Sequence, residues 1–75
     1  MIQYDSPAFW AAIKGDFVTV DADGSAYTWF RIEPSIPADA NYWSNCEDSC
    51  CELDALDLDR ASLPPWRESL RNRPT

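Results

Sequence analysis

Three cysteines lie close together in the sequence, at Cys46, Cys50 and Cys51, and the chain contains no histidine. Thiolates bind Zn²⁺ well, but a zinc site takes four ligands, and its paired cysteines commonly have two residues between them. The spacing here differs, so these cysteines are weak candidates for metal ligands, and we predict free thiols that are buried. We predict no cofactor, and a zinc or redox module built on the three cysteines is an alternative hypothesis.

The other residue types offer little for catalysis. Without histidine the chain lacks the commonest general base, and it can form neither a Ser–His nor a Cys–His pair. The carboxylates, the tyrosines and the single lysine show no spacing typical of a paired acid and base. An active site needs a nucleophile, a base and an orienting group together, so we expect a protein that is not an enzyme.

Acidic side chains are concentrated between residues 33 and 59, where no basic residue occurs. The whole chain carries 13 acids and 6 bases, a net charge of −7, which disfavours direct binding to a phosphate backbone. A locally acidic surface attracts basic surfaces over roughly 8–10 Å. We therefore predict that carboxylates imitate nucleic-acid phosphates in the basic groove of a partner protein; a solvated acidic face is the simpler alternative. The acids predicted to contact the partner are Glu47, Asp48, Glu52, Asp54, Asp57 and Asp59.

Aromatic residues make up 13% of the chain. Tryptophan and tyrosine are enriched among the residues that dominate protein interfaces. We predict that Trp29, Tyr42 and Trp43 contact the partner beside the acids, with Tyr27 and Trp66 as further anchors. In so short a chain most aromatic side chains are also needed for the core.

The elements that must position these residues are those of one small α+β domain, residues 1–75. A chain of this length buries only about 60% of its unfolded surface, so its core is thin. Ser6 and Pro7 are typical of a helix N-cap and first helical residue. They predict an N-terminal helix that reaches Lys14 and ends at Gly15 in the left-handed conformation.

Residues 16–20 and 26–32 are rich in β-branched and aromatic side chains, and they predict an antiparallel hairpin. Residues 21–25 between them indicate a turn rather than a calcium-binding loop. Their Asp-Gly pair predicts a two-residue turn, which would pair Val20 with Tyr27. A four-residue loop is the alternative.

Both faces of this hairpin carry aromatic side chains, and one helix can cover only one face. We expect the chain to bury the other face itself, through its C-terminal half or through a third strand from residues 1–4. A homodimer that buries this face is the alternative.

The C-terminal half predicts one or two short helices. Ser44 and Glu47 match a capping box, which predicts a helix over about residues 45–56 with two cysteines along one stripe. A last helix is predicted over about residues 66–71, and residues 72–75 are expected to fray.

No motif names a family, but in size and charge alone the chain resembles small acidic inhibitors encoded by phages and other mobile elements, including anti-CRISPR and anti-restriction proteins. This resemblance implies a non-enzymatic inhibitor that occupies a basic nucleic-acid-binding surface of a host protein. A small structural or regulatory subunit that oligomerises through the aromatic hairpin face is the alternative. The sequence shows neither a signal peptide nor an apolar run long enough to cross a membrane, so we expect a cytoplasmic protein.

Overall fold

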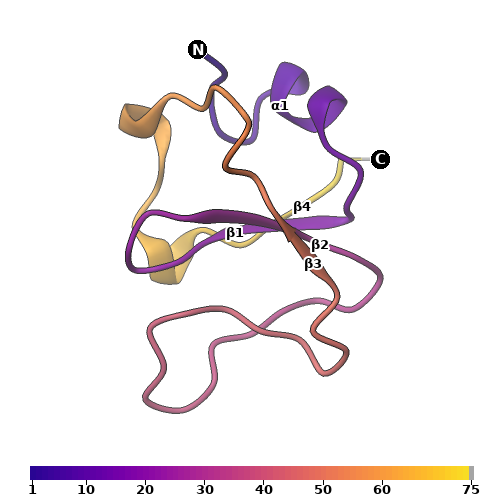
Figure 1. The fold of residues 1–75 in the computed structure, drawn as a ribbon, viewed down its shortest axis with the longest axis vertical. Helices are drawn as coiled ribbons and strands as arrows, with labels where there is room; N and C mark the ends of the chain where they lie inside the picture. The colour runs from indigo at the N-terminus through magenta and orange to yellow at the C-terminus, as the bar shows by residue number, and fades with distance from the viewer. Residues whose placement is uncertain (75) are drawn as a thin grey trace.

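A four-stranded antiparallel sheet forms the centre of the computed structural model, which describes residues 1–74 (Figure 1). The strands lie in the order β3-β2-β1-β4, and one helix covers one side of the sheet (Figure 1). The α+β class predicted from the sequence is confirmed. The elements are α1 (Pro7–Ala12), β1 (Phe17–Val20), β2 (Ala26–Trp29), β3 (Cys50–Glu52), the 3-10 turns η1 (Arg60–Ser62) and η2 (Trp66–Glu68), and β4 (Arg71–Asn72).

Helix α1 begins as predicted and ends earlier. The hydroxyl of Ser6 caps it by accepting a hydrogen bond from the backbone N–H of Phe9, at 3.2 Å. The helix stops at Ala12 because Ile13 is already extended, so the predicted left-handed glycine end is wrong. Gly15 is required for another reason, since a Cβ at this position would collide with the backbone and side chain of β2.

The turn between β1 and β2 has three residues, 22–24, and is closed by a 2.9 Å hydrogen bond from the Asp21 N–H to the Ser25 carbonyl, so both registers predicted from the sequence are wrong. Val20 pairs with Ala26 rather than with Tyr27. The backbone N–H of Gly24 donates to the Asp21 carbonyl at 2.9 Å, and Gly24 has a φ of 89°. This is the geometry of a turn followed by a left-handed residue, which glycine adopts without strain. A shift of one residue changes which side chains share a face of the sheet.

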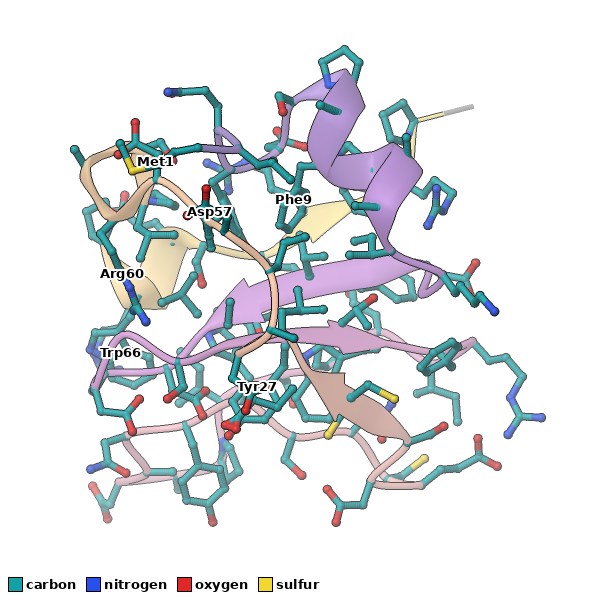
Figure 2. The ribbon with its side chains drawn as sticks, turned by 45° about the horizontal axis from the view of Figure 1, so that its top comes forward. Met1, Phe9, Tyr27, Asp57, Arg60 and Trp66 are labelled. Carbon is teal, nitrogen blue, oxygen red and sulfur yellow. The ribbon has the colours of Figure 1, made fainter. Side chains whose placement is uncertain are left out.

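With this register β1 and β2 present a mainly apolar face toward α1, on which Thr28 lies opposite Val18. Val18, Val20 and Ala26 lie there and pack against the helix. Tyr27 and Trp29 lie on the opposite face, and Figure 2 shows Tyr27 across the sheet from Phe9. The core cluster comprises Tyr4, Phe9, Trp10, Ile13, Val18, Val20 and Ala26.

The opposite face is covered by an irregular loop, residues 30–49, which lies beneath the sheet in Figure 1. Two backbone hydrogen bonds of 2.8 Å between Ser35 and Ser44 tie the two arms of this loop together. Trp29 of β2 lies on the face that this loop covers and is only 2% exposed. The chain therefore buries its own second hairpin face, as expected.

The predicted helix over residues 45–56 is wrong, and β3 occupies its centre. A turn forms where the helix was predicted to begin: the N–H of Asp48 donates to the Asn45 carbonyl at 3.0 Å, and Asp48 has a φ of 50°, which is not helical. The chain then extends and pairs with β2, whose edge would otherwise be open. The third strand thus comes from here; residues 1–4 contribute only a single bridge, between Ile2 and Leu58.

The predicted helix over residues 66–71 is only the 3-10 turn η2, followed by β4. Ser69 explains the early end, because its buried hydroxyl accepts a hydrogen bond from the Val20 N–H at 2.8 Å. This side chain fixes the C-terminal segment to β1 and directs it into the sheet. The predicted fraying is wrong for Asn72, which lies in β4, and for Arg73, whose N–H donates to the Asp16 carbonyl at 2.7 Å; Thr75 lies outside the described residues.

Arg73 binds the C-terminal end of the chain to α1 through hydrogen bonds. Its guanidinium donates hydrogen bonds to the carbonyls of Trp10, Ile13 and Gly15 at 3.0, 2.8 and 3.0 Å. The same group lies 5.1 Å from the centre of the Trp10 ring. A cation at the C-terminal end of a helix satisfies carbonyls that have no partner within the helix. Arg73 therefore does for α1 what Gly15 was expected to do.

We expect Arg73→Ala to lower the free energy of unfolding by about 2 kcal/mol, because three carbonyls lose a charged donor. Arg73→Lys should restore less than half, since an ammonium lacks the planar fork of the guanidinium. Urea unfolding at pH 7 measures both changes. The control is Lys14→Ala, which removes an exposed cation. If Arg73→Ala lowers the free energy of unfolding no more than Lys14→Ala does, the role of Arg73 is contradicted.

Stability should also fall in alkali because of Tyr4. Its hydroxyl donates to the Ser69 carbonyl at 2.7 Å, and burial raises the pKa of this phenol far above its ordinary value of 10.0. The folded state favours neutral Tyr4, so this contribution is complete below pH 10 and is lost as the pH rises further. Urea unfolding between about pH 8 and 11 should show this decline. Tyr4→Phe should flatten the decline and Tyr42→Phe, at an exposed tyrosine, should not; equal slopes in both variants would refute the assignment.

Candidate functional site

A hollow of about 250 Å³ lies on the side of the sheet covered by residues 30–49. Four aromatic rings, two carboxylates and one thiol line it, and no lysine or arginine does. Its lining residues are Asp21, Tyr27, Trp29, Tyr42, Trp43, Asp48 and Cys50. The structure thus brings together all three aromatic residues predicted to contact a partner and one of the six predicted acids. We call this feature the aromatic hollow.

Strand β2 and the loop position the rings of the aromatic hollow. Tyr27 and Trp29 are two residues apart on β2, so both side chains point to the same face, with ring centres 6.3 Å apart. Trp43 is held from two sides: its backbone N–H donates to Asp21 Oδ1 at 3.0 Å, and its indole N–H donates to the Trp66 carbonyl at 3.0 Å. The loop is therefore fixed above β2 by specific hydrogen bonds.

The rings differ in their exposure to solvent. Trp29 is 2% exposed and Trp43 is 9% exposed, so the two tryptophans form the floor of the hollow. Tyr42 is 48% exposed and forms part of its rim. The indole N–H of Trp29 donates to Thr19 Oγ1 at 2.8 Å, and that of Trp43 is also used within the chain. The hollow consequently offers ring surface and carboxylate oxygens, but no indole donor.

The hollow is electronegative. Burial raises the pKa of Asp21 above its ordinary value, although the hydrogen bond from Trp43 opposes this change. The pKa of the Cys50 thiol is also raised, first by burial and then by the negative charge of Asp48. The pKa of Tyr27 is raised by burial and by neighbouring acids. In each case the raised pKa means that the surroundings favour the neutral form, so the hollow disfavours further negative charge.

The predicted acids follow one long path rather than forming one cluster. Residues 47–59 run from the loop beneath the sheet, along the edge strand β3, to the side of α1 (Figure 1). Asp48 lies at the aromatic hollow, whereas Glu52 and Asp54 line a separate small hollow beside Arg60. We call residues 47–59 the acidic edge.

Some acids of this edge have partners within the chain. Glu47 forms an exposed ion pair of 3.0 Å with Arg31. Asp57 lies 3.8 Å from the amino terminus, beside Met1 in Figure 2. Asp59 caps η1 and accepts a hydrogen bond from the Gln3 amide at 2.7 Å. Of the six acids of this edge, Asp48, Glu52, Asp54 and Asp59 form no ion pair within residues 1–74, and Asp59 is held by hydrogen bonds instead.

The cysteines are more exposed than predicted. Cys46 and Cys51 are exposed and Cys50 is half-buried, so the prediction of buried thiols is wrong. Two of them lie on an edge strand, where neighbouring side chains point to opposite faces. Within residues 1–74, no group of three or more cysteine and acidic side chains is placed to hold a metal ion.

Sequence reasoning found the aromatic side chains of the hollow but missed Asp21 and the position of Cys50. The sequence indicates only a turn at Asp21, and the residue does accept a hydrogen bond within that turn, from the Gly24 N–H. The three-residue turn places it on the Tyr27 face of the sheet, and the Asp-Gly pair alone does not predict that turn. No local pattern connects residues 42–43 with β2, because a long irregular segment separates them.

No protein-family model, curated protein sequence or solved structure matches this chain. The single α-helix within residues 1–74 has six residues, too few to cross a membrane. The function is therefore inferred from the side chains themselves.

The two aspartates of the hairpin loop should respond oppositely to neutralisation. Asp21 has a raised pKa, so its ionised form opposes folding at pH 7. Asp23 has a lowered pKa, chiefly because it accepts hydrogen bonds from Ser25, so its ionised form favours folding. We expect Asp21→Asn to raise the free energy of unfolding at pH 7 and Asp23→Asn to lower it.

Urea unfolding at pH 7 and at about pH 2.5 measures these effects, and both should shrink at the lower pH, where the carboxyls are protonated. The gain at Asp21 should stay below about 1 kcal/mol, because water still reaches this side chain. Changes of the same sign in the two variants would contradict the assignment.

Proposed function

We propose that this protein is a non-enzymatic binding protein that recognises a basic surface of another protein through its acidic edge. The observation that carries the proposal is the edge strand itself. Asp48, Glu52 and Asp54 lie on or beside β3 without an ion pair among residues 1–74, and no basic residue occurs from 33 to 59. Such a surface gains electrostatic energy when a basic surface approaches it.

Like charges along one edge repel each other and destabilise the folded chain. A basic partner relieves this repulsion. Attraction over roughly 8–10 Å also steers the partner before contact, so association should be fast and sensitive to salt. The charges thus favour a partner that itself binds nucleic acid, because such proteins present basic grooves.

In a cell the protein would act as an inhibitor that occupies the nucleic-acid-binding surface of its target in the cytoplasm. The support for this role is the combination of small size, net charge of −7 and the unpaired acids of the edge. It is the role implied by the resemblance in size and charge to inhibitors encoded by phages and other mobile elements.

The two alternatives have less support. A subunit that oligomerises through the aromatic hairpin face needs that face to be open, whereas Trp29 is 2% exposed beneath residues 30–49. A zinc module needs ligands that converge, and the cysteine and acidic side chains of residues 1–74 include no such group.

Charge reversal on the acidic edge tests the proposal. The variant Glu52→Lys/Asp54→Lys should lose capture of a partner from a lysate, because both side chains are exposed and neither holds the fold by an ion pair. The control Glu33→Lys/Glu68→Lys has the same net charge and changes exposed acids outside the edge. Tagged proteins are compared by pull-down and mass spectrometry, with circular dichroism to confirm folding.

The captured protein should be released by about 0.5 M salt, which shortens the screening length to a few ångströms, and it should be displaced by added DNA or RNA. Equal capture by the edge variant and the control would overturn the proposal. So would a partner that is retained at high salt and that nucleic acid does not displace.

A further inference from the structure

The aromatic hollow has the chemistry of a site for a cation. Its floor is the two buried tryptophans, Trp29 and Trp43, and its wall includes Tyr27 and Tyr42. The faces of aromatic rings carry partial negative charge and attract a cation within about 6 Å of the ring centre. The carboxylates of Asp21 and Asp48 lie on the same lining. Rings and carboxylates therefore favour the same kind of ligand.

Other classes of ligand fit less well. An anion would meet two carboxylates and no basic side chain. A purely apolar group would take the carboxylates of Asp21 and Asp48 further out of water and offer them no new hydrogen-bond donor, which is costly. Asp21 Oδ1 already accepts a hydrogen bond from Trp43, so a new donor can bind at its second oxygen. A ligand that combines positive charge, N–H donors and a flat surface meets all of these conditions.

We propose that the aromatic hollow binds an arginine side chain of the partner protein, with its guanidinium against the rings and its N–H groups toward Asp21 and Asp48. A guanidinium is planar, stacks on aromatic faces and pairs with carboxylates, whereas an ammonium is compact and strongly hydrated. The inference deepens the proposed function, on which it rests for the source of the arginine. The preference of the hollow for a guanidinium does not depend on that function.

The chain does not fill this site with an arginine of its own. Each of its arginines is engaged elsewhere within residues 1–74. Their contacts are Arg31 with Glu47, Arg60 with the Gly24 carbonyl, Arg67 with the Trp66 ring, Arg71 with Asp5, and Arg73 with the end of α1. An arginine in the hollow must therefore come from another molecule.

The position of the hollow also suits a partner that approaches the acidic edge. Cys50 of the edge strand lies opposite Trp29 in the sheet, and it lines the hollow together with Asp48. The edge and the hollow thus share residues. A basic surface steered toward the edge brings its arginines to the rim formed by Tyr42 and Asp48.

Titration with small model compounds tests the proposal on the intact chain. The probes are N-acetyl-arginine amide, N-acetyl-lysine amide and N-acetyl-citrulline amide, the last having the shape of arginine without its charge. The indole N–H signals of Trp29 and Trp43 are followed by NMR. We expect saturable shifts with the arginine compound and binding that is about tenfold weaker or more with citrulline, because the cation–π and ionic contacts are lost.

Variants locate the binding. Tyr42→Ala and Asp48→Asn should each weaken arginine binding about three- to tenfold, since each removes an exposed part of the rim. Asp54→Asn removes an acid of the edge outside the hollow and should change it by less than about twofold. The dispersion of the other amide signals confirms that each variant is folded.

No saturable shift with the arginine compound, equal binding of citrulline, or binding of the lysine compound as tight as that of arginine would each overturn the inference. Its failure is separable from that of the proposed function. If the Glu52→Lys/Asp54→Lys variant loses capture but the unchanged protein does not bind the arginine compound, the acidic edge is supported and the arginine site is refuted. If the unchanged protein binds the arginine compound but that variant captures the partner undiminished, the arginine site is supported and the acidic edge is refuted.

Discussion

The structure depends on one constraint: a hairpin with large apolar side chains on both faces must be covered on both sides in a chain of 75 residues. A two-stranded ribbon has no stability of its own. Helix α1 covers the face of Val18 and Val20, and the loop of residues 30–49 covers the face of Trp29. Because one helix cannot cover both faces, the irregular segment of residues 30–49 covers the second, and it contributes Tyr42, Trp43 and Asp48 to the aromatic hollow.

Contacts between distant residues hold these covers in place. The Ser69 hydroxyl accepts a hydrogen bond from the backbone of β1, and the Tyr4 hydroxyl donates to the Ser69 carbonyl. Arg73 ties the carbonyl end of α1 to the C-terminal segment through three hydrogen bonds. Each of these bonds joins segments far apart in the sequence. Their loss should therefore loosen the whole sheet rather than one element, because the core is thin.

Local signals predicted the parts of the fold that local physics decides. The Ser6 cap depends only on the next turn of chain, and the sequence located it correctly. The strands of the hairpin were also located, but their register depends on the difference between a two- and a three-residue loop, which the Asp-Gly pair alone does not resolve. The helix over residues 45–56 failed because pairing with β2 outweighed a capping pattern. The rings of the site were identified from residue type, whereas their meeting with Asp21 follows from tertiary structure.

Burial and charge are linked in the aromatic hollow. The loop that covers Trp29 also brings Asp48 to the rim, and the hydrogen bond that orients Trp43 holds Asp21 where burial disfavours its charge. The fold therefore keeps a carboxylate in surroundings that oppose its ionisation. Such an arrangement weakens the folded state at neutral pH and strengthens the attraction for a cation, since both effects come from the same loss of water. A bound guanidinium would offset this cost and return the pKa of Asp21 toward its ordinary value. By linkage, protonation of Asp21 and binding of a cation oppose each other.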